Sequence, residues 1–406
     1  MKALNDLKRH CWKLMDKMKK IFIVILFFPF FYAQELQNYL LPEYKELFAT
    51  KFQKELASKY YNQLSWISPI TISYSKTWSN QITARHRLQK SFSISINQPI
   101  FRFGGIYYGI KFAKTQYNLN MTALKEEEKK LIVQAISLVF QLKKSDLAIH
   151  KAKLQIANAR LRVKKIKELY NSGLADSLTF EDELIKLNEA KIALLHLLEQ
   201  KNQLVANFKK LSNKDYKKIP LPKLKLLSKE QYLQNNFEIR KAQNAYLHAI
   251  NAKKVTMAKY LPTISISASY NYITPSDFAK RDFTKYGLSI SLPISVNAFN
   301  DLQKAKLAEI ESALNIKTTQ RAQEQEYKAL IKNIALLHQK ELLAKEELRL
   351  YKKLYYHTKV LYKAGQKSKE DVKLFYNMFK IKQDDCKIYY FEKELQLLKL
   401  YEKTML

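Results

Sequence analysis

The sequence predicts a mainly α-helical, elongated protein built from two copies of one unit, in which a pair of β-strands precedes a long helical hairpin. Helix-breaking residues are few, with six Gly and nine Pro among 406 residues. They are absent from four long intervals, which are residues 110–172, 174–219, 294–364 and 366–406. If the 63 residues of the first interval are all helical, that helix reaches about 95 Å, longer than a compact domain.

Four short segments alternate apolar side chains with Ser, Thr or Asn, which is typical of β-strands. They lie at about 70–78, 90–98, 264–273 and 286–293. Each is close to the length that crosses a bilayer at a tilt. An apolar outer face and a polar inner face suit a lipid-facing β-barrel with a wet lumen, although a water-soluble sheet with one buried face alternates in the same way.

The two halves of the chain repeat their landmarks in the same order. Residues 93–100 correspond to 287–294 at an offset of 194, and 170–173 correspond to 362–365 at an offset of 192. Repeats of this kind dictate the fold. We expect a first repeat at 34–227, with strands about 70–98 and a helical hairpin about 106–210, and a second at 228–406, with strands about 264–293 and a hairpin about 298–400.

Apolar residues recur at three- and four-residue steps in both arms of the first predicted helical hairpin. Such stripes require partner helices. One stripe comprises Leu131, Ile132, Ala135, Leu138, Val139 and Leu142, and the other Leu184, Leu187, Ala190, Leu194, Leu197 and Leu204.

The N-terminal segment has the pattern of a secretory signal. Lys17, Lys19 and Lys20 precede the apolar residues 21–33, a run too short for a spanning helix. We expect residues 1–33 to be a signal peptide cleaved after Ala33, with translation starting at Met1, Met15 or Met18; a membrane anchor is the alternative.

The formal charge of +34 admits nucleic acid or acidic lipid as a partner. Lysines are scattered along the predicted helices, so we interpret most of them as solvated outer faces and expect no nucleic-acid binding. Beyond the signal, Cys386 is the only cysteine, and the histidines are dispersed. The sequence therefore predicts no metal site and no cofactor. It also contains no nucleophile–base pair or phosphate loop, and we expect no enzyme activity.

Residues 170–178 read Tyr-Asn-Ser-Gly-Leu-Ala-Asp-Ser-Leu. This stretch resembles the turn at the helical hairpin tips of the TolC family of outer-membrane efflux channels. The matching residues are Tyr170, Gly173, Leu174, Ala175, Ser177 and Leu178. The second copy keeps Tyr362, Gly365 and Ser368 but carries Gln366 and Lys367 in place of Leu and Ala.

The family's strand-to-helix junction is also similar to Gln98-Pro99-Ile100-Phe101 and the following Gly104-Gly105. The second copy departs here, with Leu292-Pro293-Ile294-Ser295 and no Gly pair. The resemblance extends over nearly all of the chain after the signal, through the order and spacing of the repeats more than through identity.

The resemblance implies a homotrimer in the outer membrane, with a shared 12-stranded β-barrel and a long periplasmic α-barrel. It implies an efflux channel that takes metal cations or drugs from a periplasmic adaptor and an inner-membrane pump. The alternatives are a type I protein secretion duct, a periplasmic adaptor, or an exported coiled coil that binds other molecules.

The resemblance also assigns roles to individual residues. The adaptor would dock on the two tips, at Tyr170, Gly173, Leu174, Ala175 and Ser177 and at Tyr362, Gly365 and Ser368. Glycine suits the end of a helix because it tolerates a left-handed backbone, and Asp176 and Ser177 are candidate caps of the returning helix. Asp371 and Glu370, with Asp182 as a substitute from the first copy, are the expected acidic gate of the tunnel.

Overall fold

The computed structural model describes residues 39–81, 84–274 and 282–405, so the expected signal peptide at 1–33 lies outside the described residues. Four long helices dominate: α3 (Gly105–Asn171), α4 (Ser177–Lys209), α7 (Ala298–Lys363) and α8 (Lys369–Glu402). The shorter helices are α2 (Pro42–Leu64), α5 (Lys229–Gln234) and α6 (Phe237–Lys259). The strands are β1 (Thr71–Gln81), β2 (Ala84–Phe101), β3 (Thr263–Thr274) and β4 (Asp282–Ser291).

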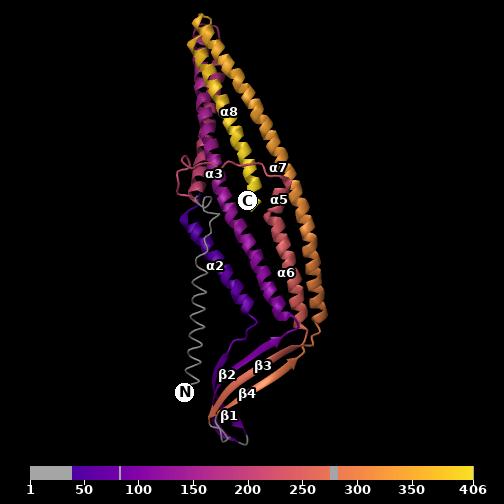
Figure 1. Cartoon of the computed structure of the whole chain (residues 1–406). Helices are drawn as coiled ribbons and strands as arrows, with labels where there is room; N and C mark the ends of the chain where they lie inside the picture. The colour runs from indigo at the N-terminus through magenta and orange to yellow at the C-terminus, as the bar shows by residue number, and fades with distance from the viewer. Residues whose placement is uncertain (1–38, 82–83, 275–281, 406) are drawn as a thin grey trace, which may run out of the picture.

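The chain is drawn out along one axis, with the strands at one end and the helical tips at the other (Figure 1). The order α2, β1, β2, α3, α4 in the first half recurs as α6, β3, β4, α7, α8 in the second half. Helices α4, α7 and α8 lie within intervals that lack Gly and Pro, as the sequence predicts, whereas α3 covers nearly all of the interval 110–172 but begins earlier, at Gly105. No helix in the described part of the chain is both long and apolar enough to cross a membrane.

The strands form one antiparallel sheet in the order β1-β2-β3-β4. The predicted strand positions are confirmed, but β1 and β2 extend beyond their predicted bounds, and β4 begins at Asp282, four residues earlier than expected. The loop expected after Trp78 is shorter, because the β1–β2 pairing continues past an irregularity near Ser79 to Gln81 and Ala84. Strand β2 also continues through Pro99 to Phe101, where a register shift accommodates a residue that cannot donate a backbone hydrogen bond.

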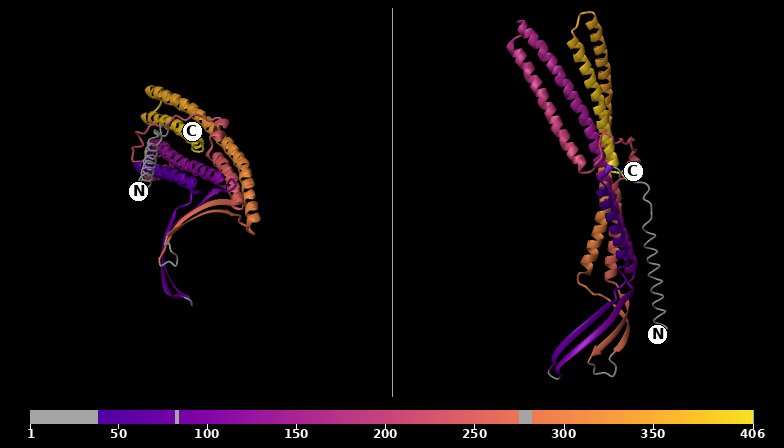
Figure 2. Two further views of the ribbon diagram at one scale, coloured as in Figure 1. Left: turned by 60° about the horizontal axis from the view of Figure 1, so that its bottom comes forward. Right: turned by 90° about the vertical axis from the view of Figure 1, so that its left-hand side faces the viewer.

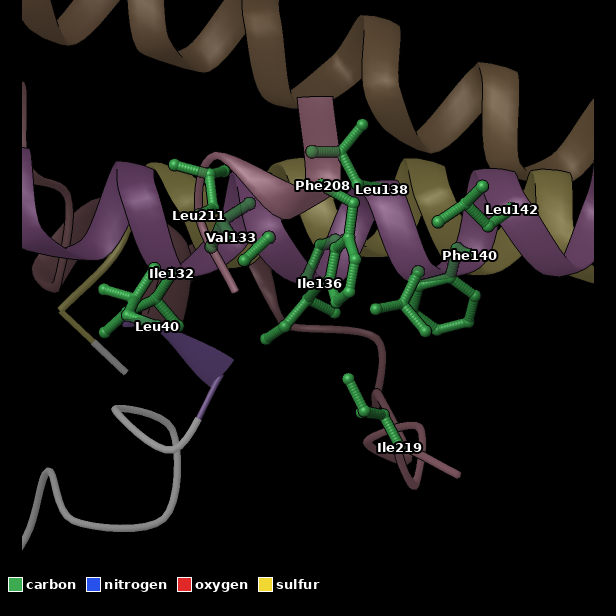
Figure 3. Close-up of a cluster of buried hydrophobic side chains, with 13 residues drawn as sticks. Leu40, Ile132, Val133, Ile136, Leu138, Phe140, Leu142, Phe208, Leu211 and Ile219 are labelled. Atoms are coloured by element: carbon green, nitrogen blue, oxygen red, sulfur yellow. The ribbon is translucent and has the colours of Figure 1, made fainter. Parts of the chain in front are cut away.

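The largest apolar core lies midway along the bundle, where α3 packs against the end of α4 and the segment that follows it (Figure 3). The predicted α3 stripe is confirmed: Ile132, Ala135, Leu138, Val139 and Leu142 are buried. Burying one large aliphatic side chain stabilises the fold by about 1.5–3 kcal/mol. This core therefore anchors the middle of the molecule and leaves both ends to extend from it.

The predicted α4 stripe is correct only in part. Leu187 is buried and packs with Ile156 and Ala159 of α3, whereas Leu184 is exposed. Helix α4 has α3 as its main neighbour, so one helical face cannot cover the whole stripe within a single chain.

Candidate functional surfaces: the sheet and the two helical tips

The sheet has one apolar and one small-polar face, because its register aligns like residues across the strands. Ile72 is paired with Ile94, and Ile94 with Tyr270. One position along, Ser73 is paired with Ser93, and Ser93 with Asn271. Alternate residues of a strand point to opposite faces. The paired apolar residues therefore form one face of the sheet, and the paired small polar residues form the other.

The apolar face is uncovered within one chain. The helices leave from one end of the sheet and lie against neither face (Figures 1 and 2). As a result Trp78 is 70% exposed and Tyr286 is 82% exposed. Further exposed apolar side chains are Ile70, Ile72, Tyr74, Leu288 and Ile290. An apolar patch of this extent marks a surface that another phase or molecule covers.

The polar face is lined by hydroxyl groups that bond to each other across the strands. The side-chain oxygens of Ser73 and Ser93 lie 2.7 Å apart, and those of Ser75 and Ser91 lie 2.6 Å apart. The sheet curves strongly, as the tilted view on the left of Figure 2 shows. In the described residues β1 pairs only with β2 and β4 only with β3, so both edges are open to further strands.

The first tip joins α3 to α4 through a left-handed glycine. Gly173 has a φ of 70°, a conformation that other residues adopt only with strain. The amide of Gly173 donates to the carbonyl of Tyr170 (3.0 Å), and the amide of Leu174 donates to that of Leu169 (2.8 Å). These two bonds satisfy the last carbonyls of α3 as a Schellman motif.

The second tip, between α7 and α8, repeats this backbone. Gly365 has a φ of 74° and donates to Tyr362 (3.0 Å), while Gln366 donates to Leu361 (2.9 Å). A Cβ atom at either glycine would meet nothing within 4 Å. Backbone conformation, and not lack of space, therefore selects glycine at both tips.

The side chains of the two tips differ sharply. The first tip exposes Leu174 (76%) and Leu178 (74%) on either side of the half-buried Ala175. At the offset of 192 that separates the copies, the second tip carries Gln366, Lys367 and Glu370. The first tip is thus an apolar knob and the second a polar one.

An aromatic pair supports the first tip. The rings of Tyr170 and Phe180 stack at 5.7 Å with an interplanar angle of 10°. The equivalent of Phe180 in the second copy is Val372, so Tyr362 has no matching ring at that position. Phe180 was not among the residues predicted from the sequence, although an aromatic residue one helical turn after the cap is a pattern that could have indicated it.

Caps begin both returning helices, but not as the sequence predicted in every detail. Asp176 is the N-cap of α4 and accepts from the amide of Thr179 (2.7 Å). Hydrogen bonding with the side chain of Thr179, and then with its amide, lowers the pKa of Asp176. The expectation that Ser177 also caps is wrong, because Ser177 is the first residue inside α4. In the second copy Ser368 is the N-cap, in a reciprocal capping box with Asp371.

The acids expected to form a gate all have basic neighbours in the same chain. Glu370 pairs with Lys164 of α3 (2.9 Å), and Asp371 lies 3.7 Å from Lys165. Asp182 pairs with Lys186 on its own helix (2.5 Å). The structure therefore brings Glu370 and Asp371 together, beside α3, and leaves Asp182 apart from them in its own pair.

The pKa values of Glu370 and Asp371 follow from these contacts. The hydrogen bond from Lys164 lowers the pKa of Glu370. Partial burial alone would raise the pKa of Asp371, but hydrogen bonds from Ser368 and the charges of Lys165 and Lys367 outweigh it and lower the value. Both carboxyls are ionised at neutral pH.

Over residues 39–81, 84–274 and 282–405 no group of three or more His, Cys, Asp or Glu side chains is arranged to hold a metal ion. No protein-family model matches the sequence, and no curated protein is significantly similar to it.

Solved structures, in contrast, share the fold over nearly the whole chain. The Campylobacter jejuni CmeC outer membrane channel matches with a TM-score of 0.71 and 14% identity, over 91% of this chain and 84% of that one. The Vibrio cholerae outer membrane protein VceC matches with a TM-score of 0.70 and 13% identity, over 89% and 93%. CusC, whose crystal structures concern its folding and transmembrane channel formation, matches with a TM-score of 0.68 and 14% identity, over 88% of this chain and 87% of that one.

These matches define the class of structure. The chain has the fold of the outer membrane channels CmeC and MtrE, the latter from Neisseria gonorrhoeae and solved in its open state. Of the expected fold class, the mainly helical architecture is confirmed, and the four strands form the small antiparallel sheet found in these channel folds.

Proposed function

We propose that this protein is the subunit of an outer-membrane efflux channel, working as a homotrimer without catalytic activity or cofactor. The fold supports the proposal, since the matched channels share it over most of their length. In this assembly the sheet spans the membrane and the helices form a long periplasmic tunnel.

The observation that carries the proposal is the two-faced sheet. Its apolar face is exposed over all four strands, while the opposite face carries Ser and Asn. Lipid is the environment that favours such a face, and a wet lumen suits the hydroxyls. A spanning sheet must also close on itself, because open edges leave backbone groups unpaired in hydrocarbon.

The trimer supplies that closure. Four curved strands with two open edges do not form a barrel alone, whereas three copies provide twelve strands in a ring. Because outer-membrane barrels of single chains begin at about eight strands, twelve is within the range of stable closed barrels.

A pair of variants tests which face meets lipid. Leu288 and Ser289 are neighbours in β4 and point to opposite faces. A lysine on the lipid face near the midplane costs about 2–4 kcal/mol, whereas lumen substitutions change selectivity instead. We expect Leu288→Lys to lower the yield of heat-resistant trimer in outer-membrane fractions and Ser289→Lys to preserve it. Equal effects of the two changes, or wild-type protein recovered as soluble monomer, would contradict the proposal.

We propose that the tips dock a periplasmic adaptor, which links the channel to an inner-membrane pump. The apolar knob formed by Leu174, Ala175 and Leu178 supports this, because solvent-exposed leucines at a hairpin end are suited to burial against a partner. Tyr170, Gly173 and Ser177 complete the proposed docking surface of the first tip, and Tyr362, Gly365 and Ser368 form that of the second.

We further propose that Asp371, with Glu370, narrows the tunnel entrance in the trimer. Because Asp371 already belongs to a capping box, charge and capping must be separated. Asp371→Asn removes the charge but keeps an acceptor, while Asp371→Ala removes both. A gate requires both variants to change single-channel conductance and block by cations. If conductance stays at the wild-type value in both, Asp371 is only a cap.

The cargo we propose is a metal cation or a drug. The type I secretion alternative makes a different prediction in cells: deleting the gene would leave metal and drug tolerance unchanged and abolish export of a protein substrate. A periplasmic adaptor would instead fractionate as a soluble or inner-membrane protein.

A further inference from the structure

The segment that joins α4 to α6 concentrates positive charge. Residues 209–229 contain eight lysines and a single acid, Asp215. Helix α8, by comparison, carries seven basic and seven acidic side chains over residues 369–402. We call seven of the eight lysines the lysine collar: Lys209, Lys210, Lys214, Lys217, Lys218, Lys223 and Lys225.

The collar lysines are exposed and uncompensated. All seven side chains are exposed, and none makes an ion pair with another residue in the part of the chain that the structure describes. Lys229, at the end of the segment, is different because it pairs with Glu324 (3.4 Å). The long-helix lysines at the same level behave like Lys229: Lys201 pairs with Asp146 (2.6 Å) and Lys144 with Glu392 (3.2 Å).

The backbone under the collar is fixed, although most of it is neither helix nor strand. Ile219 is buried in the main core, and its carbonyl accepts from the ammonium of Lys143 (3.0 Å). The hydroxyl of Tyr39 donates to the carbonyl of Pro220 (2.8 Å). The hydroxyl of Tyr401 bonds both to the amide and to the carbonyl of Lys225.

These anchors present the lysines outward in a defined order. Leu221 and Leu224 pack against the core, while Lys223 and Lys225 on either side of Leu224 are exposed. The collar is therefore a pre-arranged row of charges, which reduces the entropy cost of binding a partner.

The position of the collar along the molecule indicates whether lipid headgroups can be its anionic partner. The segment crosses the bundle midway between sheet and tips (Figures 1 and 2). Helix α6, with 23 residues, separates it from β3 by about 34 Å at 1.5 Å per residue. Charges of lipid headgroups are screened within about 8 Å at physiological salt. A sheet that spans the membrane thus leaves the collar beyond the reach of the headgroups.

We infer that the lysine collar binds a carboxylate-bearing polymer of the bacterial cell wall, through which the periplasmic shaft passes. This inference rests on the proposed function, which places the helices between the two membranes. Three chains would form a ring of 21 lysines around the shaft, three times the seven of one collar. A repeating polyanion can engage such a ring at many points at once, and multivalent binding of this kind is strong even when each contact is weak.

The test is co-sedimentation of the full-length protein in detergent with purified, insoluble peptidoglycan. A variant with all seven collar lysines changed to Gln is compared with wild type and with a matched control. The control changes seven exposed α7 lysines to Gln: Lys304, Lys306, Lys317, Lys328, Lys332, Lys340 and Lys352. Both variants must give the same trimer peak as wild type by sedimentation velocity.

We expect wild type and the control to bind at low salt and to be released at about 0.5 M NaCl, where charges more than about 4 Å apart are screened. The collar variant should bind at least about 10-fold more weakly, as loss of multivalency predicts. Peptidoglycan whose carboxylates have been amidated should bind none of the proteins.

Three results would overturn the inference. They are equal losses in the control and collar variants, undiminished binding to amidated peptidoglycan, and collar-dependent binding of phosphatidylglycerol vesicles in place of peptidoglycan. Ion conductance of the same preparations is measured in parallel. Protein that conducts ions but does not bind peptidoglycan contradicts only the inference that the collar binds the cell wall. Absence of conductance contradicts the proposed channel function.

Discussion

The two helical tips share a backbone and differ in their surface. Gly173 and Gly365 adopt nearly the same φ, 70° and 74°, and each closes its helix with the same pair of hydrogen bonds. Around this common turn the first copy exposes Leu174 and Leu178, while the second exposes Gln366 and Lys367. The backbone geometry of a tip and the chemistry of its exposed surface are therefore set by different residues.

Because backbone geometry and surface chemistry depend on different residues, some side chains of a duplicated tip can be replaced without loss of the turn. The glycine and the cap hold the helices together, so their loss affects folding in either copy. The turn uses only the backbone of the residues at the apex, and their side chains are exposed, so these side chains are open to change. In a trimer with six tips, an adaptor would meet apolar and polar knobs as two distinct kinds of site.

The largest expected effect comes from charging the apolar knob. Leu174→Glu should abolish efflux while preserving the trimer, because burying an unpaired carboxylate in the docking interface is strongly unfavourable. Efflux is measured as drug or metal tolerance in cells that lack the native gene.

The matched variant on the second tip is Gln366→Glu, which introduces the same group at the equivalent position. We expect it to leave tolerance within a factor of two of wild type, since a polar apex already lies there. Retained efflux in Leu174→Glu, or an equal loss in both variants, would refute the difference between the tips.

The backbone similarity predicts equal costs for glycine replacement. Gly173→Ala and Gly365→Ala each place a Cβ on a left-handed residue, which costs about 1–2 kcal/mol, with no steric clash to add. Amide hydrogen exchange at the adjacent helix ends should accelerate by a similar factor in both variants. A clear effect at one tip only would show that the two turns are not equivalent.

The aromatic stack gives a smaller, one-sided effect. Phe180→Ala removes the ring that stacks on Tyr170, and pairs of this kind contribute about 0.5–1.5 kcal/mol beyond area burial. Hydrogen exchange near Tyr170 should increase. Val372→Ala at the second tip is the control and should change exchange near Tyr362 less, because no ring lies at that position.

The smallest effect is the response of the caps to acid. The pKa values of Asp176, Glu370 and Asp371 are lowered from ordinary values of 3.8, 4.5 and 3.8. Depressed carboxyl pKa values stabilise the fold above the unfolded values, and that stabilisation is lost as pH falls through the folded ones. Relative to the intrinsic exchange rate at each pH, exchange at both tips should therefore increase below about pH 4.5 and be constant between pH 5 and 7. A rise already at pH 6 would contradict this assignment.

Most of the secondary structure could be predicted from the sequence, because it depends on local signals. The two left-handed glycines, the alternation in the strands and the intervals without Gly or Pro each act within one element. The caps were only half accessible: Asp176 was identified, but Ser177 was wrongly given the same role, since a one-residue shift at a helix start leaves no sequence trace.

Contacts between distant segments were not accessible. Two ion pairs join residues about 200 positions apart, Lys164 with Glu370 and Lys165 with Asp371. No sequence pattern near either partner predicts these pairs. The same reason applies to the exposure of Leu184, which depends on how many helices surround α4. The sequence shows the lysines of the collar, but only the fold shows that they lie together midway along the bundle.

Single-channel recording of the purified trimer in a planar lipid bilayer is the most direct test of the central claim. If the protein is a channel, discrete and reproducible conductance steps that depend on salt concentration are expected, and Ser289→Lys on the lumen face should change their ion selectivity. Purified trimers that insert into the bilayer yet give no conductance, or a selectivity unaffected by that charge, would contradict the claim.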